Sequence, residues 1–497
     1  MTSMLDEAPD SATEGDAKGM GKCRSFGMIL NVIIGTGFFA IPHAYYKSGL
    51  PLSIIATVLA TGFGMLGAVW TLETVSRSRG FKYAKSKQLK HKVFMNKITS
   101  LQIEFSESMG IFCGKIGAAF CHIVMLLYAL GSLWAYVSMF SSIGASITMQ
   151  YILKWEGECI IEDNPSFSCR TVYSFFVALL CALMIGFESF NMNWMSHVQS
   201  FFMGYRVVAF LLIALSCIVS LVVNGNKWTN SLQESIEKME SYHSEMKMFG
   251  FNWSGFPTLF SAVCFAFNCA YNLPSIVPLM GKERHSAGCL TVVALVVSGT
   301  LYLGLGVLLA VTLGPSTREF VILNWADFGQ KGFQMDGQTD VDAASQAGKD
   351  GLKIPAAFAI AIKLTVMLFP MANILSVFPL IAGSVGFSFF SSFPDHFKKS
   401  YGRAGPLLLR YLVTLPPFLL ALFFPSLDVV IEFCGLSAVF LVVFIPALLQ
   451  FESKRKCGTE WGTPYSGWWS HGVFIGASVV YGIVALSVGI CELVANG

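Results

Sequence analysis

The chain has 497 residues, of which 54% are hydrophobic and only 13% are charged, and its mean hydropathy is +0.62. Because soluble domains carry about 25% charged residues, this composition excludes an ordinary soluble protein and favours one embedded in lipid. The net charge of +3 is nearly balanced and does not indicate nucleic-acid binding.

Long apolar runs follow one another along the chain. A helix needs about 20 apolar residues to cross a bilayer, and eleven runs are of this order or longer. They occupy residues 26–47, 51–72, 116–149, 171–189, 199–223, 254–280, 287–313, 354–390, 404–424, 427–449 and 469–494. We therefore predict an all-α polytopic membrane protein with eleven transmembrane helices. The third and eighth runs are too long for one straight crossing, so we expect those helices to be tilted, kinked or extended beyond the membrane.

The polar segments indicate how the chain is oriented. Residues 1–25 lack an apolar core, which predicts a disordered cytosolic tail and no cleavable signal peptide. With the N-terminus in the cytosol, the cytosolic segments would carry about twice as many Lys and Arg residues as the opposite ones. The positive-inside rule therefore predicts a cytosolic N-terminus and an extracellular or luminal C-terminus. No sorting signal distinguishes the plasma membrane from an endolysosomal or vacuolar membrane.

The cysteines and histidines show no spacing typical of a metal site, and no cluster of nucleophile and base indicates an enzyme. We predict no metal, no cofactor and no catalysis. Cys159 and Cys169 are the only cysteines in a segment predicted to lie outside the cytosol. In an oxidising compartment they would form a disulfide, and two free thiols are the alternative.

The first apolar run contains a sequence suited to a helix break. Gly35, Thr36 and Gly37 lie in its middle, and Pro42 follows. Glycine lowers the cost of unwinding, and an unwound segment at membrane depth exposes N–H and C=O groups that can line a binding site. A packing face of small residues is the alternative interpretation.

The sixth apolar run has a second candidate break. Asn268 and Asn272 are costly in a bilayer, and Pro274 removes a helical hydrogen bond. A broken helix that lines a polar cavity accounts for all three residues. Because the two candidate breaks fall in the first and sixth helices, they favour two five-helix repeats of inverted topology.

This repeat defines the predicted organisation. The first repeat covers residues 26–223 and is followed by an outside loop at 224–253. The second repeat covers residues 254–450 and includes a Gly-, Gln- and Asp-rich outside loop at 314–352, which we expect to be mobile. Residues 451–497 would add a cytosolic linker and helix 11.

Two basic residues fall inside apolar runs. Lys363 lies about nine residues into the eighth run, roughly 14 Å along a helix, which is too deep for its ammonium group to reach the interface comfortably. It is therefore a candidate coupling residue, and a structural pair with a carboxylate or with carbonyl groups is the alternative. Arg206 lies nearer the cytosolic end of the fifth run, and we interpret it as structural.

Two segments resemble a known family. Residues 31–44 resemble the first helix of the amino acid/auxin permease family, which is part of the amino acid–polyamine–organocation superfamily. Residues 424–449, which include Gly435 and Pro446, resemble the tenth helix of the same family. Residues 104–144 and 268–275 resemble its transmembrane protein 104-like orphan branch most closely. The resemblance covers residues 26–450 and implies a broken-helix transporter of neutral amino acids or similar small solutes, coupled to a proton or sodium ion.

The resemblance also implies a substrate site. The backbone N–H groups at Gly35, Thr36 and Gly37 would receive the substrate carboxylate at the N-terminus of a half-helix. The amine and side chain of the substrate would be faced by Phe265, Asn268 and Cys269.

The same resemblance leaves two coupling ions open. Asn31 matches an asparagine that sodium-coupled relatives use near the cation, so a sodium ion at Asn31 is one possibility. Those relatives also have a hydroxyl on helix 8, where this chain has Met371 and Ala372. Lys363 lies one to two turns earlier, and its ammonium group could replace a metal cation or carry a proton. This departure favours proton coupling.

Three functions are compatible with these patterns. The first is a proton-coupled amino acid symporter, the second a sodium-coupled one, and the third a sensor or scaffold that binds an amino acid without transporting it. The predicted partners are a small-molecule amino acid with its coupling ion and the lipid bilayer, with no nucleic acid.

Overall fold

The fold was taken from a computed structural model. It describes residues 21–86, 103–153, 166–188, 192–223, 248–314, 317–325, 356–393, 400–401, 404–424, 427–458 and 461–496. Within these ranges the chain is almost entirely helical and has no strand, which confirms the predicted all-α class. Cys159, residues 1–20 and most of the loops at 224–253 and 314–352 lie outside the described residues.

The helices follow the predicted runs closely. They are α1 (Lys22–Ile33), α2 (Ile41–Ser48), α3 (Leu50–Ser86), α4 (Phe105–Tyr151), α5 (Phe167–Glu188), α6 (Met192–Val223), α8 (Phe256–Ala266), α9 (Leu273–Ile276), α10 (Ala287–Leu313), α11 (Ala356–Ser392), α13 (Ala404–Phe423), α14 (Leu427–Val439), α15 (Ile445–Cys457) and α16 (Gly472–Asn496). Short helical segments that matter below are η1 (Thr36–Phe39), η3 (Ala270–Asn272), η4 (Val277–Ser286), η7 (Phe440–Phe444) and η9 (Trp468–Ser470).

In the described part of the chain, 9 helical segments are long and apolar enough to cross a membrane, and the bent pair of α1 and α2 brings the number to 10. The apolar part of α16, Gly472–Val488, is shorter. A multi-pass membrane protein is therefore confirmed, whereas the count of eleven crossings stays a prediction.

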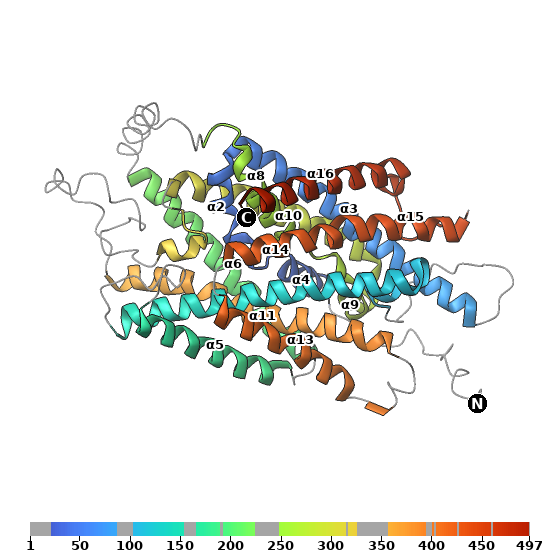
Figure 1. Cartoon of the computed structure of the whole chain (residues 1–497), viewed down its shortest axis with the longest axis horizontal. Helices are drawn as coiled ribbons and strands as arrows, with labels where there is room; N and C mark the ends of the chain where they lie inside the picture. Colours follow the sequence, from blue (N-terminus) through green and yellow to red (C-terminus); the bar gives the residue numbers. More distant parts are fainter. Residues whose placement is uncertain are drawn as a thin grey trace.

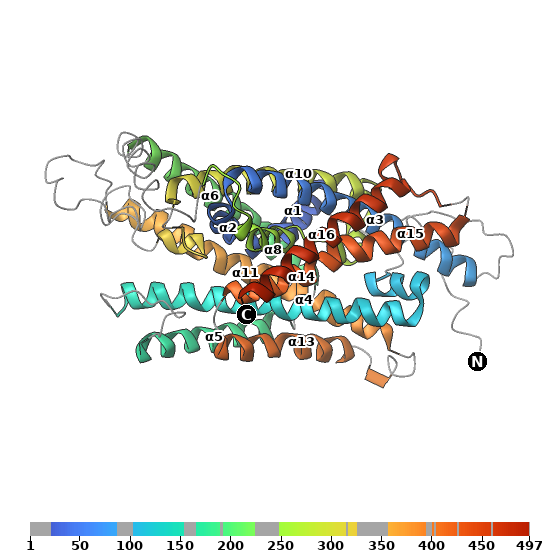
Figure 2. The same ribbon diagram turned by 45° about the horizontal axis from the view of Figure 1, so that its top comes forward.

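The long helices run along the longest axis of the molecule and form two groups (Figure 1). α4, α5, α11 and α13 pack against one another, and α5 and α13 lie along one side of the molecule (Figure 2). α1, α2, α3, α8 and α10 form the second group, with α10 towards the opposite side. α6 contacts α1, α10 and α11, and α14 contacts α4 and α8, so these two helices connect the groups.

The two overlong runs behave differently. α4 has 47 residues and is kinked at Gly114, whose φ of 77° lies in the left-handed region that favours glycine. α11 has 37 residues and continues through Pro370 and Pro379. The α4 kink lies just before the predicted run 116–149, and both helices extend past the residues of a single straight crossing.

Close packing brings α14 onto the helix that carries the second break. A Cβ atom on Gly435 of α14 would overlap the backbone of Ser261 in α8. Only a glycine allows the two helices to approach this closely. Gly435 belongs to the segment that resembles the family's tenth helix, and its role here is steric.

Two charged residues in the C-terminal half of α3 are buried. Their position next to a basic segment would instead predict that they are exposed to solvent. Glu73 and Arg77 are both fully buried, and the Arg77 Nη2 atom donates to Glu73 Oε2 at 2.5 Å. Arg77 also donates to Gln450 and Ser453 of α15, at 2.7 and 2.8 Å. Ser470 of η9 donates to Glu73 at 2.6 Å. We call these five residues the Glu73 network, and it joins α3, α15 and η9.

Candidate substrate site at two helix breaks

The first helix is broken where the glycine-rich sequence lies. α1 ends at Ile33, and the Gly35 N–H donates to the Ile33 carbonyl at 2.8 Å in a tight turn instead of continuing the helix. η1 then begins at Thr36, and the axes of the two halves differ by 53°. The first N–H groups of a helix have no partner within it, so the start of η1 presents donors at the break.

The second break also lies where the sequence indicates. α8 ends at Ala266, Phe267 to Cys269 are not helical, and η3 begins at Ala270. The Cys269 N–H donates to the Phe267 carbonyl at 3.0 Å, again a tight turn. Asn268 therefore lies at the break itself.

The two breaks are in direct contact. A Cβ atom on Gly37 would lie 2.8 Å from the Cα atom and 2.9 Å from the Cβ atom of Ala266. Such distances are shorter than real Cβ atoms tolerate, so the start of η1 can approach the end of α8 only with glycine at position 37. Two segments 229 positions apart in sequence thus form one site.

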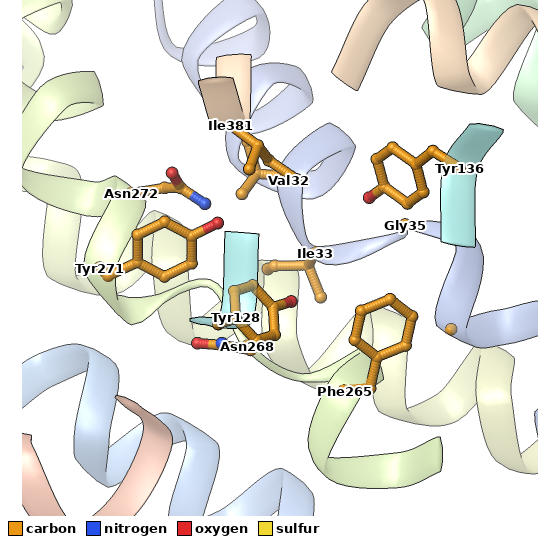
Figure 3. A pocket seen from close by; sticks show the side chains of 11 residues that line it. Val32, Ile33, Gly35, Tyr128, Tyr136, Phe265, Asn268, Tyr271, Asn272 and Ile381 are labelled. Carbon is orange, nitrogen blue, oxygen red and sulfur yellow. The ribbon is translucent and has the colours of Figure 1, made fainter. Parts of the chain in front are cut away.

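A small cavity lies between the breaks (Figure 3). Its lining comes from the α1 break, from α4, from the α8 break and from α11. The lining residues are Val32, Ile33, Gly35, Gly37, Tyr128, Tyr136, Phe265, Asn268, Tyr271, Asn272 and Ile381. Its volume is about 10 Å³, which is room for roughly one water molecule. A larger ligand would require the walls to move apart.

Several polar groups at the cavity are buried and lack a hydrogen-bond partner among the described residues. They are both amide atoms of Asn268, the Tyr271 hydroxyl and the Asn272 Oδ1 atom. These side chains gather at one end of the cavity, beside Tyr128 (Figure 3). Buried polar groups nearly always have a partner, so unpartnered ones at a cavity are suited to hydrogen-bond a polar ligand or water.

The site residues expected from the sequence occupy different positions. Gly35, Gly37, Phe265 and Asn268 line the cavity. Cys269 is buried next to Asn268 but is not part of the lining. The backbone of Thr36 lies between the two glycines, and its side chain lies outside the described residues. The roles given to these residues stay predictions.

The two candidate coupling residues contact different parts of the structure. Lys363 of α11 is buried, and its Nζ atom donates to Gln150 at 2.8 Å and lies 4.8 Å from the centre of the Tyr151 ring, near the end of α4. Asn31 is buried in α1, where its Oδ1 atom accepts a hydrogen bond from Arg206 of α6. Neither Lys363 nor Asn31 lines the cavity.

The sequence interpretation did not include the tyrosines of the site. Tyr128 and Tyr136 lie eight residues apart on α4 and so share a face of that helix. The hydroxyl of Tyr136 would lie 3.1 Å from a Cβ atom on Gly35. Tyr302 of α10 donates from its hydroxyl to the Ile33 carbonyl at 2.9 Å and so satisfies a carbonyl freed by the break. The spacing of about two helical turns between Tyr128 and Tyr136 was the sequence feature that could have identified these residues.

The chemistry of the site is that of ligand binding. Within the described part of the chain, no group of three His, Cys, Asp or Glu residues could hold a metal ion. The site offers N–H groups at the start of a half-helix, neutral amide and hydroxyl groups, and aromatic rings. N–H groups in this position attract a carboxylate, and the rings suit an apolar side chain.

Two solved structures resemble the whole chain. A Na⁺-coupled sialic acid symporter, in a substrate-bound outward-open state, has a TM-score of 0.50 and 13% identity, and the match covers 94% of this chain and 89% of that one. MhsT in complex with L-phenylalanine has a TM-score of 0.55 and 13% identity, with 96% and 100% covered. At this identity the likeness shows the fold, which is the broken-helix transporter fold predicted from the two breaks.

Relatives by sequence identify the family. The chain is 21% identical to a transmembrane protein 104 homolog of Drosophila melanogaster, over 88% of this chain and 89% of that protein. It is 23% identical to a transmembrane protein 104 homolog of Caenorhabditis elegans, over 71% of this chain and 65% of that protein. Residues 19–488 match the family described as transmembrane amino acid transporter protein. This match covers nearly the whole chain, and the chain therefore belongs to the transmembrane amino acid transporter family.

Proposed function

We propose that this protein is a secondary active transporter that binds a neutral amino acid, or a similar small solute, between the breaks of helices 1 and 6. The observation that carries the proposal is the contact of the two breaks around a cavity with unpartnered buried polar groups. The family and the broken-helix fold support transport as the general activity.

The geometry suggests how the substrate would be held. Its carboxylate would accept hydrogen bonds from N–H groups at the start of η1, where the helix dipole also favours negative charge. Its amine would donate to the Asn268 and Asn272 side-chain oxygens, which have no partner among the described residues. Phe265 and Tyr128 would pack against its side chain.

The size of the cavity supports alternating access. Free amino acids are larger than one water molecule, so the groups of helices on either side of the cavity must separate for a substrate to enter. The two breaks are the places where the backbone can bend, because their residues are not held in continuous helical hydrogen bonding. The half-helices would then open the cavity to one side of the membrane at a time.

Proton coupling is part of the proposal. Lys363 is a buried basic residue that donates to a neutral amide, and α11 has no hydroxyl at Met371 or Ala372 for a sodium ion. The alternatives are sodium coupling and a sensor that binds without transport.

Counterflow in proteoliposomes tests the proposal. Purified protein is reconstituted with unlabelled amino acids inside, and entry of each labelled amino acid of a panel is followed. We expect at least one neutral amino acid to accumulate. Asn268→Ala should reduce the rate at least tenfold, because it removes two buried polar groups from the site, whereas Ser174→Ala, on the exposed face of α5, should leave it unchanged. Binding of an amino acid without any counterflow would favour a sensor, and the absence of both would refute the proposal.

A further inference from the structure

Arg206 of α6 is a buried basic residue that hydrogen-bonds to α1, the first half of the broken first helix. It is 3% exposed. Its Nη2 atom donates to the Oδ1 atoms of Asn31 in α1 and Asn373 in α11, and its Nη1 atom donates to the Leu30 carbonyl of α1 at 3.5 Å. Three oxygen atoms from two helices therefore converge on one guanidinium group that a third helix supplies.

The charge of this guanidinium group is not neutralised by an ion pair. No Asp or Glu of the described residues forms a salt bridge with Arg206, and its buried Nε atom has no hydrogen-bond partner there. A buried charge without a counter-charge is costly, so it is kept only where it is functional or where oxygen dipoles compensate for it. The two amide oxygens and the carbonyl oxygen provide such dipoles.

The same oxygen atoms would suit a small metal cation. Amide and backbone carbonyl oxygens are ligands of hard cations, and in broken-helix transporters the carbonyls of an unwound helix coordinate the coupling ion. Leu30 and Asn31 belong to the last turn of α1 before its break, and Asn373 approaches from α11. In this chain the guanidinium group occupies the space among these oxygens.

We infer that Arg206 acts as a fixed internal cation: its guanidinium group fills an oxygen-lined cation site between α1, α6 and α11, so no sodium ion binds there. The inference rests on the proposed transport function and deepens its coupling mechanism. It makes Asn31 a hydrogen-bond acceptor for Arg206 and not a ligand of sodium. It also gives Arg206 a positioning role, because its bonds hold the last turn of α1 against α11 beside the Ile33–Gly35 turn that lines the cavity.

A fixed cation at this place would also favour a substrate with a carboxylate. The proposed carboxylate position at the start of η1 lies only five to six residues after Leu30 and Asn31, across the break that follows α1. In a low-dielectric interior, opposite charges attract over such a distance far more strongly than in water. The substrate would thereby supply the counter-charge that the described residues lack.

Thermal unfolding of the purified protein tests the inference without any transport assay. The melting temperature is compared in sodium chloride and in choline chloride at equal ionic strength and pH. We expect no difference for the unchanged protein or for Arg206→Lys, which keeps a cation in the site. Arg206→Ala empties the site, and sodium should then raise its melting temperature by about 2 °C or more.

The outcomes separate a fixed cation from a merely structural arginine. A structural arginine would lower the melting temperature of Arg206→Ala equally in both salts. Such a result, or a sodium-dependent rise in the unchanged protein, would overturn the inference. If Arg206→Ala cannot be purified, Arg206→Gln, which removes the charge with a smaller loss of volume, takes its place with the same expected and contradicting results.

Uptake then separates this inference from the proposed function. In proteoliposomes, the amino acid that shows counterflow should enter at the same rate when sodium is replaced by choline at constant pH. Uptake only in sodium would refute the fixed cation while leaving transport established. A lack of uptake in both salts would refute transport, and the melting temperatures would still decide the role of Arg206.

Discussion

At the scale of single residues, the site depends on a few positions where only one residue type fits. Gly37 is the clearest, because its Cα atom has no room for a substituent against the backbone of Ala266. Asn268 matters for a different reason, since its buried amide atoms have no partner in the described part of the protein and are free to bind a ligand. Both residues therefore matter for the contact between the two breaks and the cavity there, more than for the stability of either helix alone.

Replacing Gly37 by alanine should disturb this contact. The added Cβ atom would lie 2.8 Å from the Ala266 Cα atom, and relieving this overlap should cost about 1–3 kcal/mol of stability. Transport should fall more than stability does, because the two half-helices would be pushed apart at the site. Unfolding in detergent and counterflow in proteoliposomes measure the two effects.

Gly62 provides the matched control for this variant. It lies in the interior of α3, and a Cβ atom there would meet nothing within 4 Å. Gly62→Ala should therefore leave transport unchanged and should stabilise α3 slightly, by up to about 1 kcal/mol, because alanine favours helix more than glycine. Equal behaviour of the two variants would contradict the steric role of Gly37.

At the scale of elements, buried polar contacts join helices that are far apart in the sequence. The Glu73 network ties α3 to α15 and to η9, and its members are buried and mutually hydrogen-bonded. Removing any one of these side chains would leave buried polar groups of the others without a hydrogen bond. The network therefore fixes these three elements relative to one another. By contrast, Glu452 and Arg455 pair at 2.9 Å near the surface of α15, with Arg455 65% exposed.

Glu73→Gln should therefore destabilise the protein strongly. It leaves the Arg77 charge buried without its counter-charge, and breaking a buried pair in this way costs about 3–5 kcal/mol. Glu452→Gln, which breaks a pair whose arginine is 65% exposed, should cost no more than about 1 kcal/mol. Denaturant unfolding of both variants gives the comparison, and similar losses in the two would show that the Glu73 network does not hold the helices together.

At the scale of the whole molecule, the proposed transport cycle requires the two groups of helices to move about the cavity. α11 carries both Asn373, which contacts Arg206, and Lys363, which donates to Gln150 at the end of α4. Through these two residues α11 is linked to α6 and to α4, in addition to its other contacts with both helices.

The prediction for Lys363 is that it makes transport depend on pH. An inward proton gradient should accelerate uptake by the unchanged protein several-fold, because a proton would bind on one side of the membrane and leave on the other. Lys363→Met should remove this acceleration while substrate binding persists. Lys115→Met, at an exposed position of α4, should leave it intact. An unaltered gradient response in Lys363→Met would assign proton coupling to another group.

The sequence by itself determined the membrane class, the approximate helices and both breaks. These features are local: hydropathy over 20 residues identifies a crossing, and Gly35, Gly37 or Asn268 in the middle of one is anomalous wherever the helix lies. The family resemblance rested on the same local motifs and was confirmed by the match of residues 19–488.

Only the tertiary structure decided which residues meet. Arg206 and Asn31 are separated by 175 positions and Arg77 and Gln450 by 373, so nothing in the local pattern indicates their contacts. The sequence interpretation treated Asn31 as a possible sodium ligand and Arg206 as a structural residue. Hydropathy indicates that a buried charge is costly, but it does not identify the partners of that charge. Packing of distant helices selects those partners, since each buried polar group must find its hydrogen bonds among whatever the fold places beside it.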